Sequence, residues 1–128
     1  MRLALDTNRY TDLCRGDPEV VANVARAEAV FMTFVVIAEL HAGFAVGTRG
    51  HENERTLRNF LRKPNTEVLW ANDATVRCYA ALFRQLRMQG TPIPTNDLWT
   101  AALVTQHALV LYSRDAHFRA LPQLQILD

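Results

Sequence analysis

Short apolar segments alternate along this chain with longer segments of helical character, and this alternation constrains the fold more than any other feature. Strands are expected at residues 2–5, 29–33, 67–70, 109–112 and near 124–127. Helices are expected at residues 10–14, 19–28, 34–46, 51–63, 73–89 and 95–107, with a short one after 115. Strands that alternate with helices imply right-handed crossovers and a mostly parallel sheet, an α/β fold with both faces covered.

The size and composition of the chain agree with one globular domain over residues 1–128. The formal net charge is +1, without the large positive excess that often marks a nucleic-acid binder. Lys63 is the only lysine, and the many arginines suit phosphate binding, although a genome rich in G and C explains them equally well. No signal peptide is recognised and no apolar run approaches the roughly 20 residues of a membrane span, so we expect no membrane association and a cytoplasmic location.

Four acids occupy distinctive positions in this pattern. Parallel sheets bind ligands beyond the carboxyl ends of their strands. Asp6 directly follows the first strand and Asp115 closely follows the fourth, so both are expected at the same sheet edge. Asp97 lies in the first turn of a helix that is entered from a proline-rich connector and that Thr95 or Asn96 is expected to cap. Glu39 is the only acid in the apolar segment 34–46, interpreted as a buried helix, where an unpaired carboxylate would be costly to bury.

Each acid also has a purely structural alternative. Asp6 and Asp115 could cap the helices that follow them, and Asp97 could complement a helix dipole. Glu39 could pair with an arginine. Together, however, crowded carboxylates repel one another unless a cation intervenes, and oxygen donors suit Mg²⁺ or Mn²⁺. Zinc is disfavoured because no His/Cys cluster exists, and the scattered histidines are interpreted as structural or solvated: His41, His51, His107 and His117.

Such a site suits hydrolysis of phosphodiester bonds, because divalent metals activate water and neutralise charge on phosphoryl oxygens. No Ser/His/Asp arrangement, phosphate-binding loop or glycine-rich dinucleotide turn competes with this interpretation.

Four short motifs carry a resemblance to a known family. They are residues 5–8 (LDTN), 36–40 (VIAEL), 93–102 (IPTNDLWTAA) and 113–118 (SRDAHF), and the third is the most specific. In this order, and over nearly the whole chain, they resemble the PIN-domain family, in particular the toxin ribonucleases of VapBC-type toxin–antitoxin pairs.

The resemblance implies a three-layer α/β/α PIN-like fold with a mostly parallel sheet of about five strands. It also implies cleavage of RNA that depends on Mg²⁺, with Mn²⁺ as a substitute. On this basis the principal metal ligands are Asp6 and Asp97, and the acidic pocket is completed by Glu39 and Asp115. The residues expected to orient carboxylates or water are Asn8 and Ser113, with Thr7 a weaker candidate.

The same resemblance suggests a homodimer that is inhibited by a small VapB-type antitoxin, whose tail enters the acidic cleft. DNA binding is expected in the antitoxin and not in this chain. For contact with RNA we consider Arg9 and Arg114, next to the motifs, and Arg84 and Arg87, on the expected helix 73–89. A solvated surface charge is the alternative for each of them.

Three other functions remain open at this stage. A haloacid-dehalogenase-like phosphatase also carries an acid after its first strand, but it needs a second Asp where this chain has Asn8, and a catalytic lysine. A receiver domain likewise needs a suitably placed lysine. A catalytically inactive PIN-like module for protein or RNA interaction is the third, and the intact acids count against it.

Overall fold

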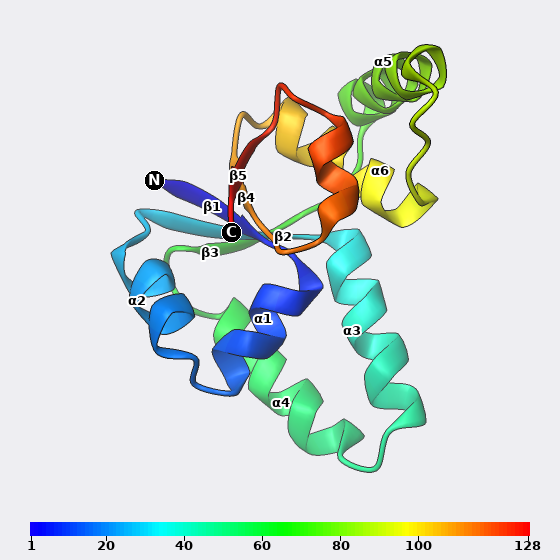
Figure 1. The fold of residues 1–128 in the computed structure, drawn as a ribbon. Helices are drawn as coiled ribbons and strands as arrows, with labels where there is room; N and C mark the ends of the chain where they lie inside the picture. Colours follow the sequence, from blue (N-terminus) through cyan, green and yellow to red (C-terminus); the bar gives the residue numbers. More distant parts are fainter.

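All the strands run parallel, as the alternation in the sequence predicts (Figure 1). The computed structural model describes residues 1–128. Its sheet has the order β3-β2-β1-β4-β5. The strands are β1 (Arg2–Leu5), β2 (Ala29–Thr33), β3 (Thr66–Leu69), β4 (Val110–Tyr112) and β5 (Gln125–Leu127). The helices are α1 (Thr7–Cys14), α2 (Pro18–Arg26), α3 (Phe34–Val46), α4 (Gly50–Leu61), α5 (Asp73–Gln89), α6 (Thr95–Gln106) and the 3₁₀ helix η1 (Ala116–Ala120).

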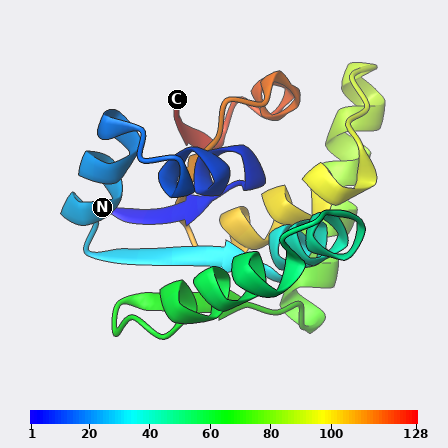
Figure 2. The same ribbon diagram turned by 90° about the horizontal axis from the view of Figure 1, so that it is seen from below.

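Helices cover both faces of the sheet, and alternate strand residues supply a core to each face (Figures 1 and 2). Leu3 and Leu5 of β1 pack in a cluster with side chains from α1, α2, α3 and α4. Ala4, between them, packs in a second cluster with α5, α6 and η1. This period of two is the geometry of a strand that is buried on both sides. The predicted three-layer α/β/α fold is therefore confirmed.

The strand order places a topological switch point at the centre of the sheet. From β1 the chain builds outward through β2 and β3, then returns to the other side of β1 to form β4 and β5. The connections that leave β1 and β4 therefore diverge to opposite faces, and parallel sheets bind ligands at such a crevice. The amide of Asp6 donates to the carbonyl of Tyr112 at 3.0 Å, which fixes the ends of these two strands side by side.

The structure corrects three local expectations. Helix α1 begins at Thr7 rather than Tyr10, because Asp6 caps it. Helix α6 follows Pro94 directly, without the side-chain cap expected from Thr95 or Asn96. Helix α3, expected to be buried throughout, becomes exposed after Leu40, and Val46 is 88% exposed. Its second half extends beyond the sheet (Figure 1), and only Phe44 among residues 41–46 is partly buried.

The buried face of α5 is also rotated from the one that the apolar pattern indicates. Apolar residues at Val76 and Phe83 suggest the inner face, yet these side chains are 52% and 49% exposed. The expected apolar face also includes Leu86, which is buried as predicted, but Thr75 and Leu82 are buried with it although they lie outside that face. The helix begins with a capping box between Asn72 and Thr75, and the Thr75 hydroxyl also contacts Gln106 of α6, which sets its rotation. None of the helices combines the length and apolar character that crossing a bilayer requires.

Candidate metal centre

Asp6 lies at the switch point, where the ends of β1 and β4 meet. Its side chain is only 6% exposed. One carboxylate oxygen, Oδ1, accepts the amide of Thr7 at 2.9 Å and caps α1. The other, Oδ2, accepts the hydroxyl of Ser113 at 2.6 Å and the amide group of Asn8 at 3.3 Å. Residues from both strand ends therefore hold this carboxylate in one orientation.

The predicted orienting residues all contact the acids or one another. The Thr7 hydroxyl donates to Oε1 of Glu39 at 2.8 Å, so the start of α1 is connected to the middle of α3. The Ser113 hydroxyl accepts the backbone amide of Asp115 at 3.0 Å while it donates to Asp6. The contacts that an orienting role requires are therefore present.

Asp97 and Asp115 approach the same place from α6 and η1. Asp97 lies in the first turn of α6 with its side chain 16% exposed, and Asp115 is the N-cap of η1. The start of α6 is fixed near the sheet by a buried contact of 3.2 Å between the hydroxyls of Thr33, at the end of β2, and Thr100. Together with Asp6 and Glu39, these acids come from four separate parts of the chain.

The electrostatics of these acids show how closely they converge. The pKa of Asp97 is raised from 3.8 to about 6, first by burial and then by the charges of Asp115 and Asp6; Glu39 adds a smaller effect and His117 opposes it. Burial also raises the pKa of Asp6, with contributions from Glu39 and Asp115, although hydrogen bonds from Ser113 and Thr7 act against this rise. Asp6 and Asp97 are thus within electrostatic range of each other and of both Glu39 and Asp115, as the sequence hypothesis requires.

The donor chemistry of this cluster fits a hard divalent cation. The four acids offer carboxylate oxygens, which Mg²⁺ and Mn²⁺ accept. A cation would also relieve the mutual repulsion that raises the pKa of Asp97. One group of donors has ligand atoms that all lie within 4.8 Å of one another, and it consists of Asp97, Asp115 and His117. Asp6 and Glu39 lie outside this group.

His117 is the site residue that sequence reasoning missed. The sequence pattern indicates a structural or solvated histidine at this position. In the structure, ring Nδ1 lies 2.9 Å from Oδ1 of Asp115 and 3.2 Å from Oδ2 of Asp97. Asp115 accepts the backbone amide of His117 at 2.9 Å, and this capping turn brings the imidazole back over the acid. The spacing Asp-x-His after the fourth strand is the signal that could have identified it.

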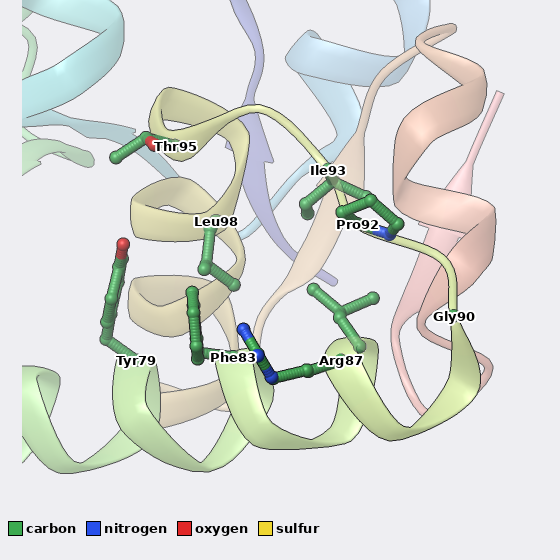
Figure 3. A pocket seen from close by; sticks show the side chains of 9 residues that line it. Tyr79, Phe83, Arg87, Gly90, Pro92, Ile93, Thr95 and Leu98 are labelled. Atoms are coloured by element: carbon green, nitrogen blue, oxygen red, sulfur yellow. The ribbon is translucent and has the colours of Figure 1, made fainter.

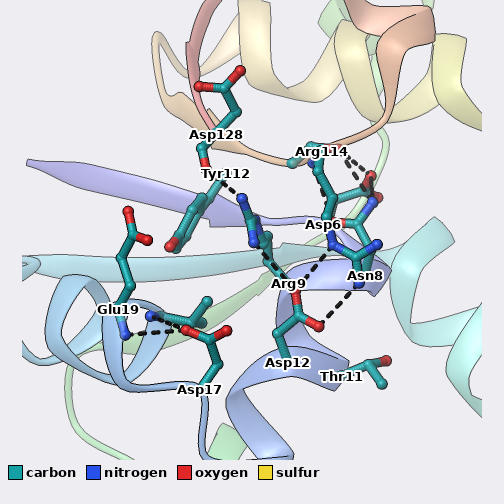
Figure 4. A network of polar contacts seen from close by, with 12 residues as sticks. Asp6, Asn8, Arg9, Thr11, Asp12, Asp17, Glu19, Tyr112, Arg114 and Asp128 are labelled. Atoms are coloured by element: carbon teal, nitrogen blue, oxygen red, sulfur yellow. Dashed lines mark hydrogen bonds and ion pairs between the residues drawn. The ribbon is translucent and has the colours of Figure 1, made fainter.

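Two of the arginines predicted to contact RNA make ion pairs within the fold (Figure 4). Arg9 has a side chain only 13% exposed, pairs with Asp12 at 3.2 Å and lies 4.8 Å from the ring centre of Tyr112. Arg114 binds Asp12 with two nitrogens, at 3.1 and 3.0 Å. The pKa of Asp12 is lowered mainly by Arg114 and further by Arg9.

The other two arginines extend from α5 into solvent. Arg84 and Arg87 are both exposed. Arg87 lines a pocket between α5 and the connector to α6, beside Phe83 and Ile93 (Figure 3). Since α6 carries Asp97, this pocket lies at the entrance to the helix that contributes to the acidic cluster.

Comparison with known proteins identifies the same architecture. The PIN domain family model matches residues 3–124. Ribonuclease VapC1 of Haemophilus influenzae (strain R2866) is 28% identical, over 97% of this chain and 95% of that protein. Ribonuclease VapC5 of Mycobacterium tuberculosis is 30% identical over 73% of this chain and 70% of that protein. The solved structure of VapBC-1 from nontypeable Haemophilus influenzae contains a chain that superimposes with a TM-score of 0.87 at 27% identity, covering 100% of this chain and 98% of that one.

Proposed function

Because the chain belongs to the PIN-domain family, we propose that it is a metal-dependent endoribonuclease, the toxin of a toxin–antitoxin pair. The observation that carries this proposal is the convergence of Asp6, Glu39, Asp97 and Asp115 at the switch point of the sheet.

In this proposal Asp6 and Asp97 are the principal ligands of a Mg²⁺ ion, for which Mn²⁺ can substitute, and Glu39 and Asp115 complete the acidic pocket. The bound ion supplies activation of water and neutralises charge on the phosphoryl oxygens. Ser113 and Asn8 hold the Asp6 carboxylate from two sides, and Thr7 holds Glu39. Such outer contacts set ligand orientation, so they position the donors before an ion or substrate arrives.

The phosphate backbone of RNA needs positive charge outside this acidic pocket. Arg84 and Arg87 are the predicted arginines whose guanidinium groups are free to supply it, since Arg9 is packed inside the fold and Arg114 is held by Asp12. Phe83 directly precedes Arg84 and lies one helical turn before Arg87 on α5, and its aromatic side chain is half exposed. Arginines beside an exposed ring are suited to single-stranded RNA.

The partners in this proposal are a second copy of the chain and a VapB-type antitoxin. Support for the antitoxin comes from the VapBC-1 structure, which contains a chain of the same fold. The second copy is carried over from the PIN-domain family. DNA binding is assigned to the antitoxin. The cytoplasm is the proposed location, because a ribonuclease must reach cellular RNA.

The contacts around Asp6 weaken the alternatives of a haloacid-dehalogenase-like phosphatase and a receiver domain. Asn8 donates its amide to Asp6 and cannot supply the second carboxylate of a haloacid-dehalogenase-like phosphatase. Lys63, the only lysine, follows α4 and is not among the contacts of the acids.

The test is cleavage of RNA by the purified chain, free of any partner, with Mg²⁺ present. Asp6→Asn and Asp97→Asn should each lower the rate by on the order of a hundredfold or more. Asp73→Asn is the matched control, since Asp73 also lies in the first turn of a helix but is exposed. Unchanged cleavage in both site variants would refute the proposed centre. Binding of RNA without cleavage under any metal would favour the inactive interaction module.

A further inference from the structure

The structure places one imidazole nitrogen among the carboxylates of the proposed metal centre. Nδ1 of His117 is 2.9 Å from Oδ1 of Asp115 and 3.2 Å from Oδ2 of Asp97. These carboxylates belong to different elements, the N-cap of η1 and the first turn of α6. The ring therefore links two acids of the centre that are far apart in the sequence.

The backbone around His117 directs its ring towards the carboxylates of Asp97 and Asp115. The Asp115 carboxylate accepts the amide of His117 at 2.9 Å, which closes the first turn of η1. The next residue, Phe118 at 0% exposure, anchors η1 in the core beside α6. The His117 side chain itself is 54% exposed and fills no core space. Packing therefore does not explain why this ring faces the acids.

We propose that His117 is a nitrogen ligand of the metal ion, together with Asp97 and Asp115, and that it shifts the preference of the centre towards Mn²⁺ over Mg²⁺. This inference rests on the proposed function. The three ligand atoms lie within 4.8 Å of one another, a span that one ion can bridge with small side-chain movements.

The preference follows from the chemistry of the donors. Mg²⁺ takes oxygen ligands and retains several waters, and it gains little from an imidazole. Mn²⁺ accepts carboxylates as readily, and because it is a softer transition-metal ion than Mg²⁺ it also gains from an imidazole nitrogen. An all-carboxylate centre would serve the two ions alike, whereas one imidazole among the carboxylates favours the ion that uses it.

A structural role for His117 makes a different prediction. If the ring only pairs with the two acids as a cation, it should be displaced when an ion enters, and no nitrogen should then lie in contact with the metal. Removal of the ring would in that case alter the affinities for both ions by the same factor.

The first experiment detects the nitrogen directly. Pulsed electron paramagnetic resonance of Mn²⁺ added to the full chain should show ¹⁴N modulation from a coordinated imidazole. The signal should disappear in His117→Gln and persist in His51→Gln, which removes an exposed histidine on α4. Bound Mn²⁺ without ¹⁴N modulation in the wild-type chain would overturn the inference and leave the proposed metal centre intact.

The second experiment compares affinities by calorimetry. His117→Gln should weaken Mn²⁺ binding by roughly tenfold or more and Mg²⁺ binding by no more than about two- to threefold. Equal losses for the two ions would contradict the proposal. Absence of Mn²⁺ binding in the wild-type chain would refute both the ligand assignment and the proposed function. Thermal unfolding of each variant, in EDTA, checks that the comparison is made between folded proteins.

Discussion

Asp97 should destabilise the metal-free fold at neutral pH, and its replacement by Asn should therefore make the protein more stable while it removes activity. The pKa of Asp97 is about 6 in the folded chain, against 3.8 for an ordinary Asp, mainly because of burial and of the charges of Asp115 and Asp6. As the pH rises from about 4 to about 6, the unfolded chain releases this proton before the folded chain does. Stability is then lost through this window and stays lower above it.

The magnitude follows from the shift. A difference of about two pKa units at about 1.4 kcal/mol each gives an upper value near 3 kcal/mol at pH 7. The Asp97 side chain is 16% exposed, so solvent screening reduces this value only in part, and we expect about 1–3 kcal/mol. For a domain of this size that corresponds to a rise in melting temperature of roughly 5–10 °C.

The assay is thermal unfolding followed by circular dichroism, in EDTA, at pH 4 and pH 7. Asp97→Asn should exceed the wild type at pH 7 and match it at pH 4, where both side chains are uncharged. Asp73→Asn, which loses only an exposed pair with Arg77, should stay within about 0.5 kcal/mol of the wild type at pH 7. Excess Mn²⁺ should reverse the order, since an ion at a thousand times its Kd stabilises the wild type by about 4.1 kcal/mol. An equal gain at both pH values would show that the charge of the buried Asp97 carboxylate is not the cause.

Other substitutions separate positioning, RNA contact and packing. Ser113→Ala should weaken Mn²⁺ binding by roughly tenfold in calorimetry, because Asp6 loses the 2.6 Å hydrogen bond that orients it; unchanged affinity would contradict that role. The double variant Arg84→Gln and Arg87→Gln should lower the slope of log affinity for single-stranded RNA against log salt by about 1.4, and an unchanged slope would exclude both from the interface. Arg9→Gln should leave that slope unchanged and lower stability by about 1–2 kcal/mol in urea unfolding, because its guanidinium packs over an aromatic ring.

Much of this architecture could be predicted from the sequence because the strands are short, apolar and separated by helices. Once the sheet is known to be parallel, the strand ends share an edge, and Asp6 and Asp115 can be assigned to it without coordinates. Glu39 could be identified because it is the only acid in the apolar segment that forms α3. In each case the position along the chain determines the position in space.

The features that escaped prediction depend on how side chains turn rather than on where elements lie. His117 faces the acids because a capping turn at Asp115 redirects its ring, and a turn of this kind leaves no periodic pattern. The inner face of α5 is set by the capping box at Thr75, so the apolar residues Val76 and Phe83 remain outside. The sequence alone makes Arg9 a candidate for contact with RNA, whereas the structure shows its guanidinium packed over the ring of Tyr112.

The structural and functional interpretations of Asp6 turn out to be compatible rather than exclusive. Oδ1 caps α1 through the Thr7 amide, and the helix N-terminus makes a negative charge there less costly. Asn caps a helix about as well as Asp, whereas Ala leaves the amide unsatisfied at a cost of about 0.5–2 kcal/mol. Asp6→Asn and Asp6→Ala should therefore lose RNA cleavage to the same degree and differ clearly in urea unfolding, with Asp6→Ala the weaker fold. If the two variants were equally stable, the capping contact would contribute nothing to the fold, and the buried position of Asp6 would have to be explained by the metal centre alone.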